Sequence, residues 1–247
     1  MNSGTVSGRH YATGQPIGVT WQDGIVSRVE LLPAGQGSDL WIAPALVDLQ
    51  INGYATVDFQ RDDLTAVELM AAVQGLRTAG CGRFLLTLMT DDWGAMMRRL
   101  RHLRALRGTS RDLTKAIAGW HLEGPFLSDK PGFCGAHPVE CMTNATREHL
   151  EELRSVTDSD PVLLTLAPER MGGIEAVGMA TSMGMRVSLG HTNAAAAILR
   201  AACNAGATGF THLGNACPQD LDRHDNILWR VLDDLSLTVC PVKKNRF

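Results

Sequence analysis

The sequence lacks several features that would assign it to a common functional class. No apolar run is long enough to span a bilayer, and residues 1–4 show neither the charged nor the apolar region of an export signal. Lys and Arg number 23 against 26 Asp and Glu, so the chain, with a net charge of −3, has no basic footprint for nucleic acid. These absences predict a protein with no nucleic-acid or membrane partner.

Cysteines are few and irregularly spaced. The six cysteines, at positions 81, 134, 141, 203, 217 and 240, form no CxxC pair and no regular framework. Without an export signal they predict reduced thiols in a cytoplasmic protein. Cys134 and Cys141 lie near the central motif described below and are alternative soft metal ligands, although buried or incidental thiols are the better interpretation.

The first 43 residues differ in character from the rest. Residues 17–21 and 25–31 read as two strands around Asp23-Gly24, which predicts a β-hairpin with a tight turn. Such a small β unit buries little apolar surface alone, so we expect it to pack on something else. Pro44 marks the change to the second part, residues 44–247.

From residue 45 onward, strand-like runs alternate with helical ones. A hydrophobic fraction of 45% over 247 residues suits a large core, and seven strands alternating with helices predict an α/β fold with a parallel, helix-covered sheet. Because the strands end in polar or ionisable residues, we favour a (β/α)8 TIM-type barrel that stops one strand short. The expected strands are residues 45–52, 84–89, 116–123, 162–167, 186–191, 209–212 and 235–240; the expected helices are 65–79, 93–106, one beginning at 146, 174–183, and 194–204 with Asn193 as N-cap.

Three of the expected strands end in metal-ligand residue types. His121 and Glu123 are two apart, so they face the same side of one strand, and His191 and His212 end two later strands. The carboxyl ends of barrel strands are where such folds carry their chemistry. Zinc-type catalytic sites use three imidazole or carboxylate ligands and leave one position open. Glu123, His191 and His212 meet this description, although a structural, hydrogen-bonded role is the alternative for each histidine by itself.

Further polar residues lie near these strand ends. His121 is a fourth ligand or, by our preference, a partner of the ligands. Gln50 and Asn52 share a face of the first barrel strand and suit substrate or water better than metal. His137 suits a sugar hydroxyl or a phosphate, and Arg223 suits bidentate phosphate recognition, although a lone loop arginine is more often simply solvated.

Several motifs together resemble one enzyme family. They are His-Leu-Glu-Gly-Pro at 121–125, Gly-Ala-His-Pro at 135–138, Ser-Leu-Gly-His-Thr-Asn-Ala at 188–194, Thr-His-Leu-x-Asn-Ala at 211–216 and Asp-Leu-Gln-Ile-Asn-Gly at 48–53. This set resembles the N-acetylglucosamine-6-phosphate deacetylases of the amidohydrolase superfamily. The resemblance runs from about residue 41 to 240, and residues 1–43 are similar to the amino-terminal part of the family's small β-sandwich.

The resemblance implies a function and a set of roles. The reaction would be hydrolysis of N-acetyl-D-glucosamine 6-phosphate to D-glucosamine 6-phosphate and acetate, in cytoplasmic amino-sugar catabolism, by a homo-oligomer (a dimer). One divalent ion is implied, zinc first and iron, manganese or cobalt otherwise, because Gln50-x-Asn52 stands where two-metal relatives have His-x-His. The implied metal ligands are Glu123, His191 and His212; the implied substrate-binding residues are Ala136, His137, Asn215, Ala216 and Arg223, with Gln50, Asn52 and His121 as further candidates.

The chain also departs from the family pattern. The family's catalytic aspartate ends an eighth strand, and no residue among the 247 takes its place; a substrate histidine expected after the seventh strand is also missing. Residues 241–247 show no strand or helix pattern. We therefore expect a truncated barrel of impaired activity and poor stability. The alternatives are an N-acetylgalactosamine-6-phosphate deacetylase and an inactive fragment that binds metal or sugar phosphate.

Overall fold

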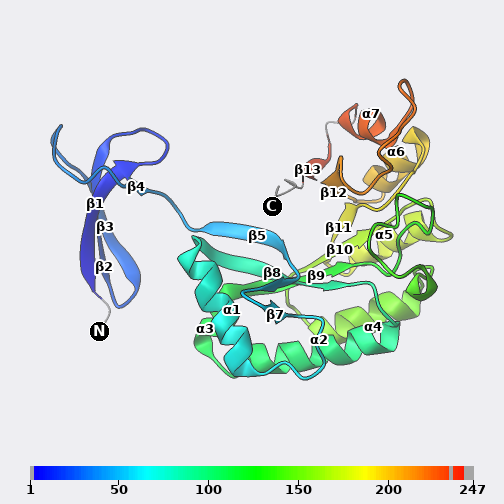
Figure 1. The fold of residues 1–247 in the computed structure, drawn as a ribbon, viewed down its shortest axis with the longest axis horizontal. Coiled ribbons are helices and arrows are strands. Elements are labelled where there is room, and N and C mark those ends of the chain that lie inside the picture. Colours follow the sequence, from blue (N-terminus) through cyan, green and yellow to red (C-terminus); the bar gives the residue numbers. More distant parts are fainter. Residues whose placement is uncertain (1–2, 234–235, 242–247) are drawn as a thin grey trace. The chain divides into compact units, whose positions relative to one another are not determined.

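The computed structural model describes residues 3–233 and 236–241 and divides into two compact units (Figure 1). Unit 1 is Met1–Leu46 and unit 2 is Val47–Phe247. The division by contacts falls three residues after the change of character at residues 43–44 that the sequence predicts. No described helix is long and apolar enough to cross a membrane.

Unit 1 contains one four-stranded sheet in the order β3-β2-β1-β4. The predicted hairpin is confirmed, because β2 and β3 pair antiparallel around Asp23 and Gly24, whose φ values are 52° and 75°. Positive φ at both turn positions matches the right-handed twist of the strands. The second sheet of a β-sandwich remains a prediction. The bounds are β1 Gly4–His10, β2 Pro16–Gln22, β3 Ile25–Leu31 and β4 Trp41–Ile42.

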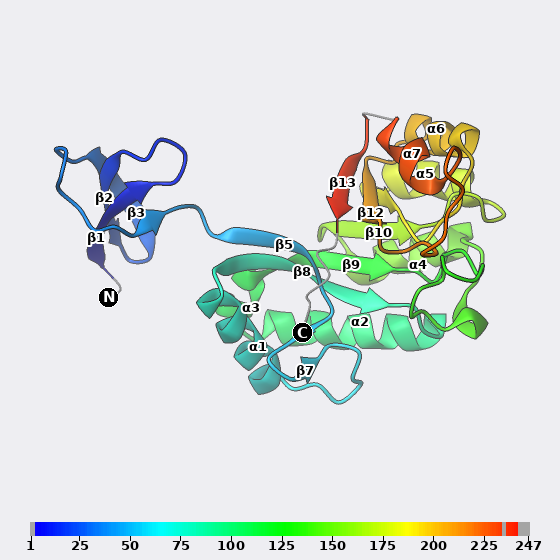
Figure 2. The same cartoon turned by 45° about the horizontal axis from the view of Figure 1, so that its top comes forward.

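Unit 2 is built on a seven-stranded sheet in the order β13-β12-β11-β10-β9-β8-β5. The strands from β8 to β13 run parallel, and β5 pairs beside β8. The sheet curls in both Figure 1 and Figure 2, as a partial TIM barrel does. The bounds are β5 Leu46–Ile51, β8 Cys81–Met89, β9 Ile117–Glu123, β10 Val162–Leu166, β11 Arg186–Leu189, β12 Gly209–Leu213 and β13 Thr238–Pro241.

The helices line the outer side of this curled sheet (Figures 1 and 2). The alternation of strands and helices that the sequence predicts is therefore confirmed. A small hairpin, β6 Gly53–Tyr54 with β7 Val57–Asp58, and the 3-10 turn η1 Val139–Cys141 add to it. The helices are α1 Ala66–Thr78, α2 Trp93–Gly108, α3 Arg111–Ala116, α4 Arg147–Thr157, α5 Gly173–Ser182, α6 Ala196–Asn204 and α7 Ile227–Leu232.

Side chains cap the starts of α1, α2, α3, α4 and α7, whereas α5 and α6 begin without a side-chain cap. Thr65 forms the predicted capping box with Glu68, and Thr146 caps α4 together with His149. The prediction that Asn193 caps the next helix was wrong, because α6 begins after Ala195 with no side-chain cap. The side-chain Oδ1 of Asn193 instead accepts from Arg230 at 3.2 Å, and its backbone N–H donates to Glu169 Oε1 at 2.8 Å.

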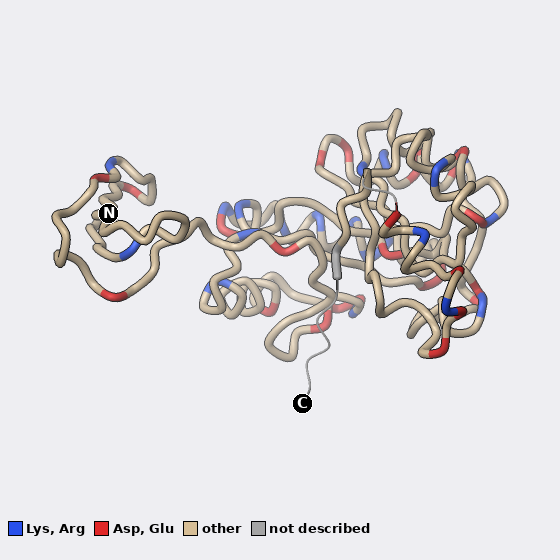
Figure 3. The backbone as a smooth tube through the Cα atoms, turned by 90° about the horizontal axis from the view of Figure 1, so that it is seen from above, with Lys and Arg blue, Asp and Glu red and all other residues tan. Residues whose placement is uncertain are grey.

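The core of unit 2 lies between the sheet and its helices. Apolar residues of β8 and β9 are fully enclosed, as expected for strands of a parallel sheet covered by helices. Figure 3 shows basic and acidic segments interspersed along the described chain. The strand predicted over 235–240 begins later, at Thr238; residues 234–235 and the tail over 242–247 lie outside the described residues.

Candidate metal centre

The structure brings together the three predicted ligands. Glu123 ends β9, and its Oε1 lies 2.6 Å from Nε2 of His212 and 3.2 Å from Nε2 of His191. One ligand atom from each of the three lies within 4.8 Å of the others. Glu123 and His191 are 1% and 5% exposed. Three donors therefore converge at the carboxyl ends of the strands, the edge that the sequence predicts.

Both histidines have an uncommon backbone conformation. His191 has φ 50° and His212 has φ 62°, in the left-handed region that non-glycine residues seldom adopt. The pairing of β12 with β13 also shifts register between Thr211 and Leu213, on either side of His212. Register shifts of this kind redirect a side chain relative to a regular strand. The left-handed turn after β11 and the irregularity in β12 aim the two imidazoles at Glu123.

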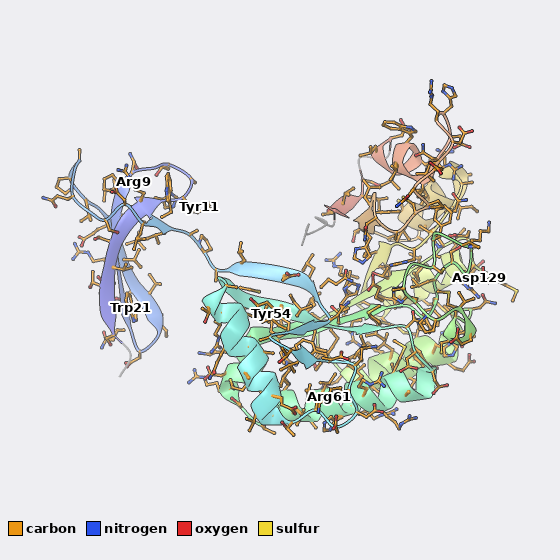
Figure 4. All side chains as sticks on the ribbon, in the orientation of Figure 1. Arg9, Tyr11, Trp21, Tyr54, Arg61 and Asp129 are labelled. Atoms are coloured by element: carbon orange, nitrogen blue, oxygen red, sulfur yellow. The ribbon has the colours of Figure 1, made fainter. Side chains whose placement is uncertain are left out.

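The loop over residues 128–138 holds His191. Its ring Nδ1–H donates to the carbonyl of Phe133 at 2.9 Å, and its own carbonyl accepts from Ser128 N–H at 2.9 Å. The first bond leaves Nε2 as the free ring nitrogen facing Glu123. Asp129 of this loop, labelled in Figure 4, lies 3.5 Å from the Arg170 guanidinium, which ties the loop to the chain after β10.

Gln50 of β5 completes the surroundings of Glu123. Its Nε2 donates to Glu123 Oε2 at 2.7 Å and lies 3.1 Å from His212 Nε2. Because Gln50 occupies Oε2, the other oxygen is the one that faces both imidazoles. His137 is also close, with Nε2 3.8 Å from Oε2. The sequence suggests that Gln50 binds substrate or water. Its contact with the Glu123 carboxylate becomes visible only in the folded structure.

The charge states of these groups suit a cation. Burial favours the neutral form of Glu123, but its close contacts with the rings of His191 and His212 favour its charged form more, so its pKa is lowered. Burial away from water, helped by the neighbouring His191, lowers the pKa of His137 to about 4. A carboxylate binds metal in its ionised form, so the lowered pKa of Glu123 suits a cation.

A cavity of about 660 Å³ adjoins the cluster. Asn52 lines it, and the side-chain Oδ1 of Asn52 is buried without a hydrogen-bond partner in the structure. His212 of the cluster lines the same cavity. Its other lining residues are Val47, Asp48, Leu49, Gln50, Ile51, Gly53, His121, Leu163 and Thr211.

The other predicted substrate residues are placed less closely. Ala136 is exposed on the loop over 128–138, one residue before buried His137. The backbone N–H groups of Asn215 and Ala216 donate to the carbonyl of His212 at 2.9 and 3.2 Å. Arg223 is exposed, and its carbonyl accepts from Trp229 Nε1 at 3.1 Å. Cys134 and Cys141 are free thiols outside the three-ligand group.

The sequence did not predict the hydrogen bonds that hold the segment directly after His191. Glu169, after β10, accepts a short hydrogen bond from Thr192 Oγ1 and a second from the Asn193 N–H. Arg230 of α7 in turn donates to Asn193 Oδ1 at 3.2 Å and to the Ala194 carbonyl at 3.2 Å. No motif signals these contacts, because the partners are separated by 23 to 37 positions.

The curated relatives include deacetylases of amino-sugar phosphates. N-acetylglucosamine-6-phosphate deacetylase of Rattus norvegicus is 34% identical over 180 residues, 71% of this chain and 42% of the rat protein. N-acetylgalactosamine-6-phosphate deacetylase of Escherichia coli O157:H7 is 29% identical over 198 residues, 78% of this chain and 50% of that protein. No protein-family model matches.

A solved structure agrees with these relatives. N-acetyl-D-glucosamine-6-phosphate deacetylase of Mycobacterium smegmatis, in a mutant complexed with N-acetyl-D-glucosamine 6-phosphate, superposes with a TM-score of 0.80 at 27% identity, covering 97% of this chain and 63% of that one. The chain is a homologue of the N-acetylglucosamine-6-phosphate deacetylases. It spans about half the length of the curated relatives it matches, among which the galactosamine-type deacetylase also appears.

The three donors fit a divalent metal ion. Two imidazole nitrogens and one carboxylate oxygen form a ligand set used in catalytic zinc sites. The hydrogen bond from His191 Nδ1 to Phe133 fixes one ring with its Nε2 toward the cluster. A partner on the second ring nitrogen of this kind accompanies most histidine ligands. This donor set therefore forms a candidate site for one metal ion.

Proposed function

We propose that the protein is a metal-dependent hydrolase that converts N-acetyl-D-glucosamine 6-phosphate to D-glucosamine 6-phosphate and acetate, in amino-sugar catabolism. The observation that carries the proposal is the convergence of Glu123, His191 and His212 at the ends of three parallel strands. The similarity to deacetylases of this substrate supports it.

In this proposal one divalent ion, zinc in the first instance, is held by Glu123, His191 and His212. When bound, such an ion polarises an amide carbonyl and makes water acidic enough to act near neutral pH. The chain's own residues hold the ligands in place: Gln50 orients the Glu123 carboxylate through Oε2, and Phe133 fixes the His191 ring. The preference for zinc follows from the two imidazoles and one carboxylate.

The substrate residues form the second part of the proposal. His137 lies beside Glu123, where it is buried and can donate from one ring nitrogen to a sugar hydroxyl. Arg223 and the backbone at Ala136, Asn215 and Ala216 are proposed to hold the phosphate and sugar. Arg223 is the natural phosphate partner because a guanidinium binds phosphate in a bidentate manner.

A second candidate substrate is N-acetylgalactosamine 6-phosphate. It is favoured by the Escherichia coli relative, which aligns with 78% of this chain. The two sugars differ in the configuration of one hydroxyl, so the same metal ligands and phosphate contacts serve either. We further propose a cytoplasmic location and a homodimer; the free thiols of the described cysteines agree with a reducing compartment.

The test is acetate release from both sugar phosphates by the zinc-loaded chain at high protein concentration, beside the Glu123→Ala variant. We expect slow release that depends on zinc and on Glu123, and the faster of the two substrates identifies the epimer. Equal release by the parent chain and by Glu123→Ala would mean that the cluster is not the site of the reaction.

A further inference from the structure

A chain of buried polar side chains runs beneath the metal centre. His121, Thr165, Ser188 and Thr211 are between 0% and 3% exposed. Such groups are costly to bury unless they are hydrogen-bonded. Each one is bonded here: His121 Nε2 to Thr165 Oγ1 at 2.8 Å, Thr165 Oγ1 to Thr211 Oγ1 at 3.0 Å, and Thr211 Oγ1 to Ser188 Oγ at 2.7 Å.

The direction of every hydrogen bond in this chain follows from its end. The other ring nitrogen of His121, Nδ1, lies 3.0 Å from the Leu49 carbonyl, which can only accept. The proton of a neutral ring is therefore on Nδ1, and Nε2 must accept from the Thr165 hydroxyl. Because each hydroxyl has one proton, Thr165 then accepts from Thr211, and Thr211 accepts from Ser188.

This chain of hydrogen bonds connects the strands that lead to Glu123, His191 and His212 with β5. His121 precedes Glu123 by two positions, Thr211 precedes His212 directly, and Ser188 lies on the strand that leads to His191. Leu49 lies on β5, which is separated from β9 by β8 in the sheet order. The imidazole of His121 therefore bonds a strand that is not its neighbour. Ordinary strand pairing cannot make this connection.

The chain of hydrogen bonds ends at Leu49, next to Gln50, the residue that orients Glu123. Gln50 follows Leu49 directly, and its amide donates to Glu123 Oε2 at 2.7 Å. On the inner side, β5 has one further described tie close by, from the Ile51 N–H to Thr87 Oγ1 at 3.1 Å. Loss of the bond to Leu49 would loosen the segment that carries Gln50 and let the carboxylate turn.

We propose that His121 is a positioning residue. As its Nδ1–H tautomer it accepts the last of a one-way chain of hydrogen bonds that begins at Ser188. Through its bond to Leu49 it anchors β5, and with it Gln50, beside Glu123. Its consequence for metal binding rests on the proposed function. The tautomer and the anchoring of β5 do not, since neither requires a metal or a reaction.

The first test is the tautomer of His121 in the unmodified chain, read from the ring nitrogen shifts of a ¹⁵N-histidine-labelled sample without metal. The proposal requires a proton on Nδ1 and an unprotonated Nε2 that accepts a hydrogen bond. A proton on Nε2 would reverse the chain at its first link and overturn the proposal.

The second test separates the two ring nitrogens by substitution. The side-chain amide of His121→Asn reaches about as far as Nδ1 and can still donate to Leu49, whereas His121→Gln places its amide near the position of Nε2. We expect hydrogen exchange of the β5 amides to stay slow in His121→Asn and to become faster in His121→Gln. The matched control Ser188→Ala removes only the first donor, so β5 should exchange as in the parent chain.

The third readout is the affinity for Zn²⁺ alone. Removing groups that orient metal ligands typically weakens binding by about 10- to 100-fold, and we expect that loss in His121→Gln but not in Ser188→Ala. Equal exchange of β5 in His121→Asn and His121→Gln would overturn the proposal. If the parent chain binds no zinc, the proposed function fails, while the tautomer and exchange results still decide the positioning role.

Discussion

At the scale of single residues, the structure explains what sequence motifs alone leave open. The three proposed ligands could be chosen from the sequence because they are ionisable residues at strand ends. The left-handed backbone of His191 and His212 and the contact from Gln50 to Glu123 could not be predicted in this way, because they depend on strands 73 to 162 positions apart meeting in space. The orientation of these side chains toward Glu123 therefore depends on the fold.

One residue-scale prediction concerns the loop over His191. Gly135 has φ 60°, and a Cβ added there would lie 2.9 Å from His191 Cε1. Gly135→Ala should therefore displace the imidazole and weaken Zn²⁺ binding by about tenfold or more, as for other groups that orient ligands. The measurement is zinc affinity by competition with a chelator.

The matched control for that variant is Gly184→Ala. Gly184 has φ 77°, but a Cβ there meets nothing within 4 Å. Both substitutions carry the left-handed penalty of about 1–2 kcal/mol, so both should lower stability, and only Gly135→Ala should lose zinc affinity. Similar zinc affinities in the two variants would show that the loop does not position His191.

Arg223 provides a second prediction at this scale. If its guanidinium binds the 6-phosphate, Arg223→Ala should weaken binding of N-acetylglucosamine 6-phosphate by about 10- to 100-fold, the loss of a charge-assisted contact of roughly 1.5–3 kcal/mol. Binding of unphosphorylated N-acetylglucosamine should stay the same. Calorimetric titration of the zinc-loaded chain with each sugar measures both, and an equal loss would remove Arg223 from the phosphate site.

At the scale of elements, strongly patterned segments were predictable and short ones were not. The strands of the curled sheet and helices α1, α2, α4, α5 and α6 follow from apolar periodicity and capping residues. The two-residue strands β6 and β7 and the six-residue helices α3 and α7 were not predicted, because they are too short to show a period. The Asn193 cap failed because its side-chain oxygen, the group that would accept from the helix, accepts from Arg230 instead.

The capping box of α1 predicts a pH dependence of stability. Hydrogen bonds from Thr65 and then from Arg61 lower the pKa of Glu68 from 4.5 to about 2. A lowered pKa in the folded state adds stability above the unfolded pKa, and that stability is lost as pH falls from about 4.5 toward 2. Glu68→Gln should therefore lower Tm at pH 7, with a smaller difference from the parent chain at pH 3.

The control for this element is Glu175→Gln. Glu175 lies in the first turn of α5, where no side-chain hydrogen bond caps the helix. Its substitution should change Tm less at pH 7 than Glu68→Gln does, because no capping contact is lost. A Glu68→Gln difference that stays constant from pH 7 to pH 3 would contradict the role assigned to the ionised carboxylate.

At the scale of the whole molecule, unit 2 supplies the proposed metal ligands from β9, the turn after β11 and β12, and their surroundings from β5 and the loop over 128–138. Glu123 is the only acidic side chain that the described residues contribute to the three-ligand group. In the proposed complex its carboxylate is a metal ligand between the two imidazoles, so it would not be free to move a proton during a reaction.

This predicts a low rate for residues 1–247. General acid–base catalysis contributes roughly 10²–10⁴ in rate, so the zinc-loaded chain should release acetate more slowly by about that factor than the Mycobacterium smegmatis deacetylase under the same conditions. The measurement compares turnover of N-acetylglucosamine 6-phosphate by the two proteins. Rates within tenfold of each other would show that a residue among these 247 already performs the proton transfer.

The central claim is that Glu123, His191 and His212 hold one divalent ion, and metal content tests it most directly. The chain is purified, loaded with Zn²⁺, dialysed and analysed for metal beside His191→Ala, Glu123→Ala and the exposed control His224→Ala. Three-ligand coordination predicts about one zinc per chain in the parent and in His224→Ala, and little or none in the other two. An unchanged zinc content in His191→Ala and Glu123→Ala would contradict the account.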